Sequence, residues 1–258
     1  MTITRPISPA TPEISPRRVA LIAGISLLFI ALLTLFAQFG VLQTLVVPGD
    51  AAATVDNLIG SEGLFRIGIA GILIVIMLDI VVAWALYVLL SPASRTLAQL
   101  VGWLRLAYSA AFAMALVNLL DAAQLLRGAE GSALSPEQLQ AQVMASVTSF
   151  DTGWVGIALA IFGLHLFGLG FVLFRSADFP RFLGVLVSIA GIGYLADSFA
   201  MILAPDFAFT FSVFTFVGEA LLILWLLWRA FKGFPSESKK IGGAAIEPRL
   251  AQSTPVAS

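Results

Sequence analysis

The sequence predicts an all-α fold, a polytopic integral membrane bundle of six transmembrane helices with both termini in the cytoplasm. Two observations predict it. Apolar residues make up 59% of the 258-residue chain and charged residues only 11%, against roughly 45 to 50% and about 25% in a soluble domain. The apolar residues also gather in six runs, each long enough to cross a bilayer core about 30 Å thick. An ordinary globular protein is therefore excluded.

Short polar segments separate the six apolar runs, which are Val19–Leu42, Leu64–Leu90, Leu97–Leu126, Thr152–Phe174, Phe182–Leu203 and Phe207–Phe231. The first run is too long for a signal-peptide core, and no clear small-residue cleavage site follows it. We therefore expect it to remain as a helix. The six spans form one domain over residues 17–232. The flanking tails, 1–16 and 233–258, lack apolar periodicity and are predicted to be disordered and cytoplasmic.

Basic residues gather in alternate loops and in both tails. They are Arg5, Arg17, Arg18, Arg95, Arg175, Arg181, Arg229, Lys232, Lys239, Lys240 and Arg249. The opposite loops hold almost none: residues 46–63 contain three acidic residues and no Lys or Arg. Because cytoplasmic loops are enriched in Lys and Arg, this asymmetry places both termini in the cytoplasm.

Two outer loops are predicted to carry short interfacial helices. In the first loop, Asp50 is positioned to cap a helix over Ala51–Ile59 that Gly60 can terminate. In the third loop, Ser135 and Gln138 form a capping box around Pro136. Leu139, Val143 and Val147 then repeat every four residues, and such an apolar stripe suits the membrane interface.

Composition also excludes several kinds of site. The chain has no Cys, which excludes disulfides, Cys-ligated metals and thiol nucleophiles. It has a single His, which excludes a three-His metal site within one chain. A net charge of −1 gives no electrostatic basis for binding nucleic acid. No metal or cofactor is assigned, and the bilayer is the one expected partner besides a small-molecule or lipid ligand.

Ionisable residues inside the apolar runs are the candidates for a functional site, because each one is costly to place in a bilayer. Asp79, His165 and Glu219 fall near the middle of the second, fourth and sixth spans, at a shared depth. The candidate ligand-binding residues are Asp79, His165, Glu219, Arg105, Asp197 and Tyr194. Candidates at the outer face are Asp50, Arg66, Asp121 and Asp151.

The three midplane residues have two interpretations. Asp79 stands in an otherwise apolar stretch, and the short loop Ser91–Thr96 brings Arg105 within reach. The two can form an ion pair that fixes the fold, or Arg105 can extend to the lipid headgroups instead. Alternatively, Asp79, His165 and Glu219 converge on a site that binds a divalent cation or relays protons. No metal-ligand spacing supports the cation.

Polar and small residues also recur at helical spacing in the later spans. Glu219 shares one helix face with Thr215 and Ser212, and Asp151 shares a face with His165. Small residues allow close helix approach in lipid, so they predict tight packing of the fourth and fifth spans. They are Gly163, Gly168 and Gly170 in the fourth span, and Gly184, Ser188, Gly191 and Ser198 in the fifth.

Several of these motifs resemble a bacterial membrane-protein family catalogued as domain of unknown function 4386. The first is VVPGDAAATVDNLIGSEGLFRIGI, which contains Asp50 and Arg66, and the second is GLHLFGLGFVLFRSADFPRFLGVLVSIAGIGYLADSF, which contains His165, Tyr194 and Asp197. The segment ALYVLL also fits. The resemblance covers residues 17–232 and implies a multi-pass protein of the bacterial inner membrane, without an established activity or catalytic residues.

Three function classes follow from these observations. The first, which the buried polar residues favour, is binding or transport of a small or lipid-like ligand near the bilayer midplane. The second is an accessory or scaffolding membrane protein whose buried charges fix helix pairing. The third is an intramembrane enzyme using carboxylate and His acid–base chemistry, which no nucleophile motif supports. We therefore expect a non-enzyme. The sequence sets neither the oligomeric state nor the ligand.

Overall fold

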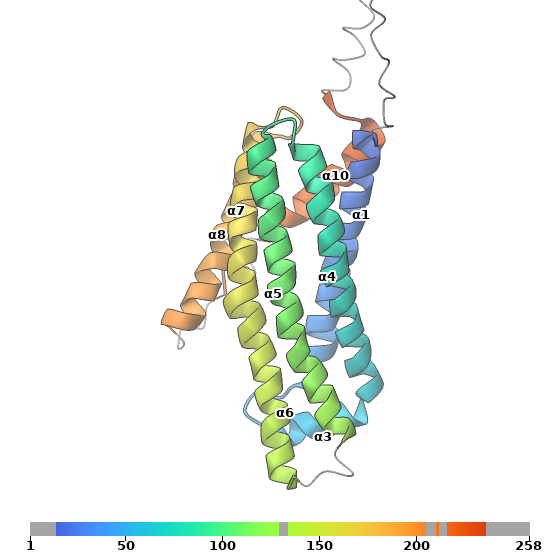
Figure 1. The fold of residues 1–258 in the computed structure, drawn as a ribbon, viewed down its shortest axis with the longest axis vertical. Coiled ribbons are helices and arrows are strands. Elements are labelled where there is room, and N and C mark those ends of the chain that lie inside the picture. Colours follow the sequence, from blue (N-terminus) through green and yellow to red (C-terminus); the bar gives the residue numbers. More distant parts are fainter. Residues whose placement is uncertain (1–13, 129–133, 205–209, 212–215, 236–258) are drawn as a thin grey trace, which may run out of the picture.

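The computed structural model describes residues 14–128, 134–204, 210–211 and 216–235. In this part of the chain every regular element is a helix (Figure 1). Five helical segments within it are long and apolar enough to cross a membrane. The all-helical, membrane-type fold predicted from composition is therefore confirmed. Residues 207–209 and 212–215 of the sixth predicted span lie outside the described part, as do residues 1–13 and 236–258 of the predicted tails.

The elements follow the predicted spans with some differences in their limits. They are α1 (Pro16–Leu35), η1 (Phe36–Leu42), α2 (Gln43–Leu45), α3 (Ala51–Gly60), α4 (Glu62–Leu90), α5 (Arg95–Arg127), α6 (Pro136–Asp151), η3 (Thr152–Ala158), α7 (Leu159–Arg175), α8 (Arg181–Leu203) and α10 (Val217–Lys232). The two elements η1 and η3 are π-helical. Each continues its neighbours without a break, giving uninterrupted helices over Pro16–Leu45 and Pro136–Arg175.

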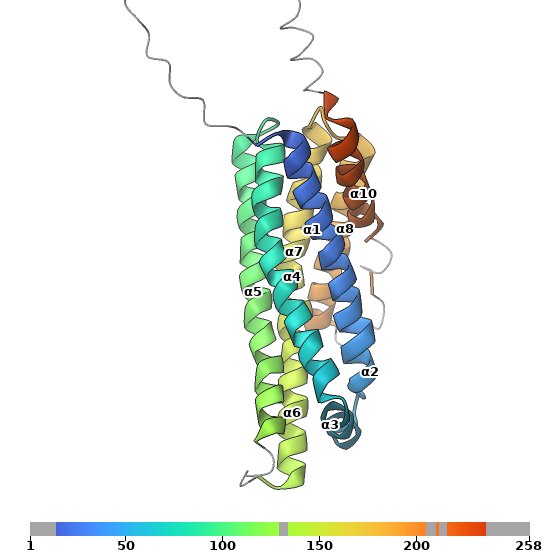
Figure 2. The ribbon, with the colours of Figure 1, turned by 90° about the vertical axis from the view of Figure 1, so that its right-hand side faces the viewer.

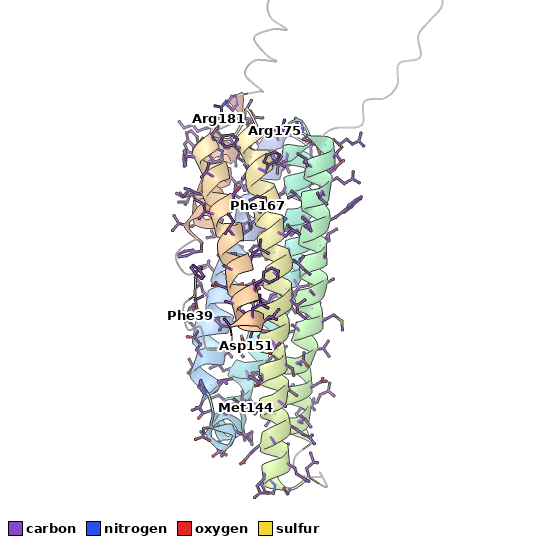
Figure 3. All side chains as sticks on the ribbon, turned by 90° about the vertical axis from the view of Figure 1, so that its left-hand side faces the viewer. Phe39, Met144, Asp151, Phe167, Arg175 and Arg181 are labelled. Atoms are coloured by element: carbon purple, nitrogen blue, oxygen red, sulfur yellow. The ribbon has the colours of Figure 1, made fainter. Side chains whose placement is uncertain are left out.

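Six of these helices form a closed ring in the order of the chain. α1 packs on α4, α4 on α5, α5 on α7, α7 on α8, α8 on α10, and α10 returns to α1. The loops α4–α5 and α7–α8 lie at the same end of the bundle as the start of α1 and the end of α10 (Figures 1 and 2). We call this the basic end, because it carries Arg17, Arg95, Arg175, Arg181 and Lys232. Arg175 and Arg181 mark it in Figure 3.

The opposite end, which we call the α3 end, extends beyond the length that a bilayer requires. α5 has 33 residues and the continuous helix Pro136–Arg175 has 40, or about 50 and about 60 Å at 1.5 Å per residue. A hydrocarbon core is only about 30 Å thick. If the basic end lies at one membrane surface, α3, α6 and the last turns of α5 therefore lie outside the other.

The helix in the third loop differs from the separate interfacial helix that was expected. Its capping box is formed as the sequence indicates: Gln138 N–H donates to Ser135 Oγ at 3.3 Å, and Ser135 N–H donates to Gln138 Oε1 at 3.0 Å. No Pro follows within the helix, so α6 runs directly through η3 into α7. Its stripe, Val143 and Val147, is buried against the bundle, where α6 packs on α5 and α3.

The helix in the first loop begins where the sequence indicates. The Oδ1 atom of Asp50 accepts a hydrogen bond from Ala53 N–H at 2.9 Å, which satisfies one free donor of the first turn of α3. Thr54 and Leu58 of this helix are fully buried. α3 therefore closes the α3 end by packing on α6.

Glycines bring α7 and α8 into backbone contact. A Cβ atom added at Gly184 would lie 2.6 Å from the carbonyl oxygen of Gly170, and one added at Gly191 would lie 2.5 Å from that of Gly163. The two pairs are seven residues apart on each helix, so the same antiparallel register serves both. The predicted packing role of these glycines is confirmed, whereas Gly168 faces Val101 of α5 instead.

Replacing either α8 glycine should separate α7 from α8. We expect Gly184→Ala and Gly191→Ala each to lower the free energy of unfolding by about 2 kcal/mol, because overpacking typically costs about 1–3 kcal/mol. Thermal unfolding in detergent measures this. Gly63→Ala is the matched control, since nothing lies within 4 Å of its added Cβ, and Ala should be neutral or slightly stabilising there. Equal stability of all three variants would contradict the proposed packing role.

Candidate functional site

Three buried side chains from three helices meet inside the ring. Asp79 of α4, Arg105 of α5 and His165 of α7 are 1%, 2% and 0% exposed. One guanidinium nitrogen of Arg105, Nη2, forms an ion pair with Asp79 Oδ1. The other, Nη1, lies 3.3 Å from His165 Nε2. The ion pair expected across the α4–α5 hairpin is therefore present, and Arg105 does not extend to the headgroups.

The neighbours of His165 determine which ring nitrogen carries the proton. Nδ1 lies 2.8 Å from the carbonyl oxygen of Val101, which can only accept, so Nδ1 must donate. Nε2 faces Arg105, which can only donate, so Nε2 must accept. This assignment gives a neutral imidazole with both nitrogens in use. His165 therefore joins α7 to α5 and has no free lone pair for use as a general base.

The cluster lies at the depth expected for a bilayer midplane. Asp79, Arg105 and His165 are 11, 10 and 10 residues from the basic ends of α4, α5 and α7. At 1.5 Å per residue, each lies about 15 Å from that end, which is half the thickness of a hydrocarbon core. Three independent helices agree on this depth.

Aromatic rings cover one side of the charged groups. The guanidinium carbon of Arg105 lies 5.6 Å from the centre of the Phe162 ring, a cation–π distance. The Phe162 ring also stacks on His165 at 5.7 Å and contacts Tyr108 at 4.7 Å. Tyr194 of α8 meets Phe162 edge-on at 5.4 Å. These rings exclude water from the ion pair.

Glu219 of α10 is the last member of the cluster, and α10 is the fifth helix to contribute a side chain to it. Its carboxyl interacts with the Tyr194 side chain and lies within electrostatic range of Arg105 and Asp79. α10 begins at Val217, so Glu219 lies in the first helical turn rather than mid-helix as expected. Thr215 and Ser212, predicted to share its face, lie outside the described residues. α10 runs obliquely across the bundle (Figure 1).

Asp79, Arg105 and Glu219 each keep one buried atom without a partner among the described residues. These atoms are Oδ2 of Asp79, Nε of Arg105 and Oε1 of Glu219. An unsatisfied buried polar atom costs about 1–3 kcal/mol, and more where the group is charged. The fold therefore retains three costly hydrogen-bonding positions, two acceptors and one donor, inside one ring of helices.

The cluster differs from the divalent-cation site that was one interpretation of Asp79, His165 and Glu219. In the described residues, no three His, Asp or Glu side chains gather as a metal site requires. Arg105 lies between Asp79 and His165 and supplies the positive charge there. Its guanidinium takes up the ligand atoms that a cation would need.

Most of the remaining candidate residues lie apart from the cluster, whereas Asp197 lies within electrostatic range of Tyr194. Asp197 accepts a hydrogen bond from the Phe211 N–H at 2.6 Å. Arg66 forms an exposed ion pair with Glu62 at 2.7 Å. Asp121, near the end of α5, lines a surface depression at the α3 end. Asp151 is exposed at the last position of α6. Asp50 caps α3. These residues do not share a site with Arg105.

A second set of buried polar atoms lies at the two π-helices and was not predicted from the sequence. Gln38 of η1 and Trp154 of η3 line one small cavity together with Phe112 and Phe150. Within the described residues, Gln38 Oε1 and Trp154 Nε1 are buried without partners. Apolar patterning carries no signal for a π-helix. A Gln inside an apolar run, as Gln38 is, was the one available indication.

Stacked aromatic rings connect this cavity with the charged cluster. Trp154 stacks on Phe112 at 5.4 Å, and Phe112 stacks on Tyr108 at 5.8 Å. Tyr108 contacts Phe162, the ring that lies against the guanidinium of Arg105. Trp154 lies 11 residues from His165 along one helix, or about 16 Å. The cavity is therefore near the outer limit of a bilayer core centred on the cluster.

Comparison with known proteins identifies the family but no activity. A stretch of 164 residues is 32% identical to a protein of Archaeoglobus fulgidus named "Uncharacterized protein", and it covers 64% of this chain and 84% of that one. No solved structure matches this chain. Residues 22–230 match the family described as a domain of unknown function (DUF4386). Because this match spans most of the chain, and in agreement with the sequence resemblance, the protein belongs to the DUF4386 family.

Proposed function

We propose that this protein spans the bacterial inner membrane six times with both termini in the cytoplasm. The five apolar helices supply five crossings, and α10, which closes the ring between α8 and α1, supplies the sixth. The start of α1 and the end of α10 share one end of the bundle, as an even number of crossings requires (Figure 2). Basic residues at that end favour the cytoplasmic side. α3 and the first turns of α6 then lie at the outer surface.

We further propose that the chain binds or transports a small cationic ligand at the Asp79–Arg105–Glu219 cluster. The observation that carries this proposal is the set of three buried atoms without partners. Two of them are carboxylate oxygens, and one is the Nε–H of Arg105. A ligand with more donors than acceptors, such as an ammonium group, matches that set. When Asp79 and Glu219 are both ionised, the cluster carries two negative charges against the one positive charge of Arg105.

The Gln38–Trp154 cavity supports an approach to the cluster from the outer side. Its polar atoms lie near the outer limit of the membrane core, and the aromatic stack leads from it to Phe162. π-helical turns occur frequently at functional sites. An ammonium-type ligand can move along aromatic faces by cation–π contacts.

A scaffolding function is the second candidate. It is favoured by the contacts through which Arg105 and His165 join α4, α5 and α7. Both Nη atoms of Arg105 and both nitrogens of His165 have partners. A cluster that served only to pair helices would show these same contacts. An enzyme is disfavoured, because His165 has no free nitrogen to act as a base.

The topology proposal is tested with the cysteine-free chain. Gly60→Cys at the α3 end and Ala93→Cys in the α4–α5 loop introduce single thiols at exposed positions. A membrane-impermeant maleimide added to intact spheroplasts should label the Gly60 variant, and should label the Ala93 variant only after lysis. Labelling of both variants from the same side would exclude the proposed arrangement.

The ligand proposal is tested by thermal unfolding in detergent with ammonium, methylammonium, sodium and potassium chlorides at constant ionic strength. Ligand at ten times its Kd should raise the unfolding temperature of the wild type by about 3–6 °C. Glu219→Gln should lose that response, because it removes the charge without changing the shape. Asp151→Asn is the control and should keep it. The proposal fails if none of the four cations stabilises the wild type, or if both variants respond alike.

A comparison of single and double variants separates the two functions. Asp79→Asn breaks the buried ion pair with Arg105 and should lower the free energy of unfolding by about 3–5 kcal/mol. Asp79→Leu with Arg105→Leu removes both charges and should cost far less, since apolar replacement of a buried pair is often neutral. Cation-dependent stabilisation should be absent from the folded double variant. If the double variant keeps that response, the ligand does not bind at Asp79 and Arg105.

A further inference from the structure

The start of α1 and the end of α10 meet at the basic end around one well-ordered arginine. The guanidinium carbon of Arg229 lies 4.6 Å from the ring centres of both Trp225 and Trp228. Its Nη1 donates to the carbonyl oxygen of Gly233 at 3.0 Å. Its Nε is buried and has no partner among the described residues. Arg229 is therefore held in place, with hydrogen-bonding capacity unused.

A second arginine reaches the same turn from α1. Gly233 has a φ of +80°, and a Cβ atom added to it would overlap the guanidinium of Arg17. Phe234, which follows, is buried and packs on Phe179 of the α7–α8 loop at 6.1 Å. The turn after α10 is thus fixed to the bundle, and it places two guanidinium groups together.

The surroundings add positive charge. Arg18 and Lys232 are exposed beside this turn, and the first turn of α1 contains no acidic residue. Among the described residues, no carboxylate pairs with Arg229. We call Arg17, Arg18, Arg229 and Lys232 the basic corner. The positive charges of Arg18, Arg229 and Lys232 at these two helix ends create a site that attracts an anion.

The lipid-facing side of α10 identifies the kind of anion. Leu224, Trp228 and Phe231 are 62%, 46% and 77% exposed. Their spacing of four and three residues places them on one helix face that leads to the basic corner. Trp and Arg at a helix end are typical of the lipid headgroup level. An anion bound here would thus have an apolar stripe directly beneath it, where acyl chains can lie.

We propose that the basic corner binds the phosphate of an anionic phospholipid, with the acyl chains along Leu224, Trp228 and Phe231. The planar guanidinium group forms paired hydrogen bonds with phosphate oxygens. The exposed Arg18 and Lys232 supply donors to the phosphate, and Arg229, whose Nε is buried, adds its positive charge. The bound lipid joins the first and last helices of the ring, which is where the ring closes.

The experiment measures thermal unfolding of the full-length protein in nonionic detergent as phosphatidylglycerol or phosphatidylcholine is added. Phosphatidylglycerol should stabilise the wild type saturably, and phosphatidylcholine should not. Arg229→Gln should raise the apparent Kd for phosphatidylglycerol about fivefold, as expected for one basic residue at a headgroup. Arg95→Gln removes the same charge at the same end but at the start of α5, and should change the Kd less than twofold.

Several outcomes would overturn the proposal. They are an equal response to phosphatidylcholine, equal weakening in Arg95→Gln and Arg229→Gln, or saturation of the response by inorganic phosphate at the same concentration, which would indicate a site for a free anion. If Arg229→Gln does not fold, Arg18→Gln replaces it with the same expected weakening. Arg18 is exposed, so its replacement leaves the packing of α10 intact.

Discussion

Burial of Arg105 is the constraint on which the rest of the bundle depends. A guanidinium that is 2% exposed at the depth of a bilayer midplane requires a counter-charge and several acceptors. Asp79 supplies the charge from α4, and His165 supplies an acceptor from α7. His165 accepts only because its other nitrogen donates to Val101, one turn before Arg105 on α5. The three helices are therefore held at one relative height, since a shift of one residue in any of them would leave a charge unpaired in a medium without water.

The same constraint explains why the other helices differ in how they pack. α7 and α8 are joined by backbone contact at Gly163–Gly191 and Gly170–Gly184, which requires no polar group. α10 contributes Glu219, whose oxygen Oε1 has no partner among the described residues. The ring thus combines a hydrogen-bonded polar junction on α4, α5 and α7 with a tightly packed seam on α7 and α8. Glu219 and Tyr194 are the members of the cluster that Arg105 does not hold by a direct hydrogen bond, so a ligand or a proton can change their contacts at the least cost to the fold.

The sequence predicted those features that depend on local composition. Apolar runs located the helices, and the short α4–α5 loop was sufficient to pair Asp79 with Arg105, because antiparallel neighbours have a fixed register. The capping groups Asp50 and Ser135 were also identified, since an N-cap acts within one turn. Other features depend on distant packing. Nothing in the sequence near Asp151 indicates that α6 continues into α7. Gln38 and Trp154, which line one cavity, are more than 100 residues apart in the sequence. Glu219 was expected at mid-helix and lies in the first turn instead, because hydropathy does not show that α10 begins at Val217.

The two halves of the bundle differ in how their helices are built and packed. Between the cluster and the basic end, the Gly170–Gly184 contact and the turn at Gly233 leave little room, because backbone and guanidinium groups already touch there. Between the cluster and the α3 end, the continuous helices Pro16–Leu45 and Pro136–Arg175 both contain π-helical turns at the level of the Gln38–Trp154 cavity. A π-helical turn replaces the regular i→i+4 hydrogen bonds with i→i+5 bonds, and such turns occur frequently at functional sites. The half of the bundle toward the α3 end is therefore the less regular one, whereas the half toward the basic end is closed by direct backbone contact.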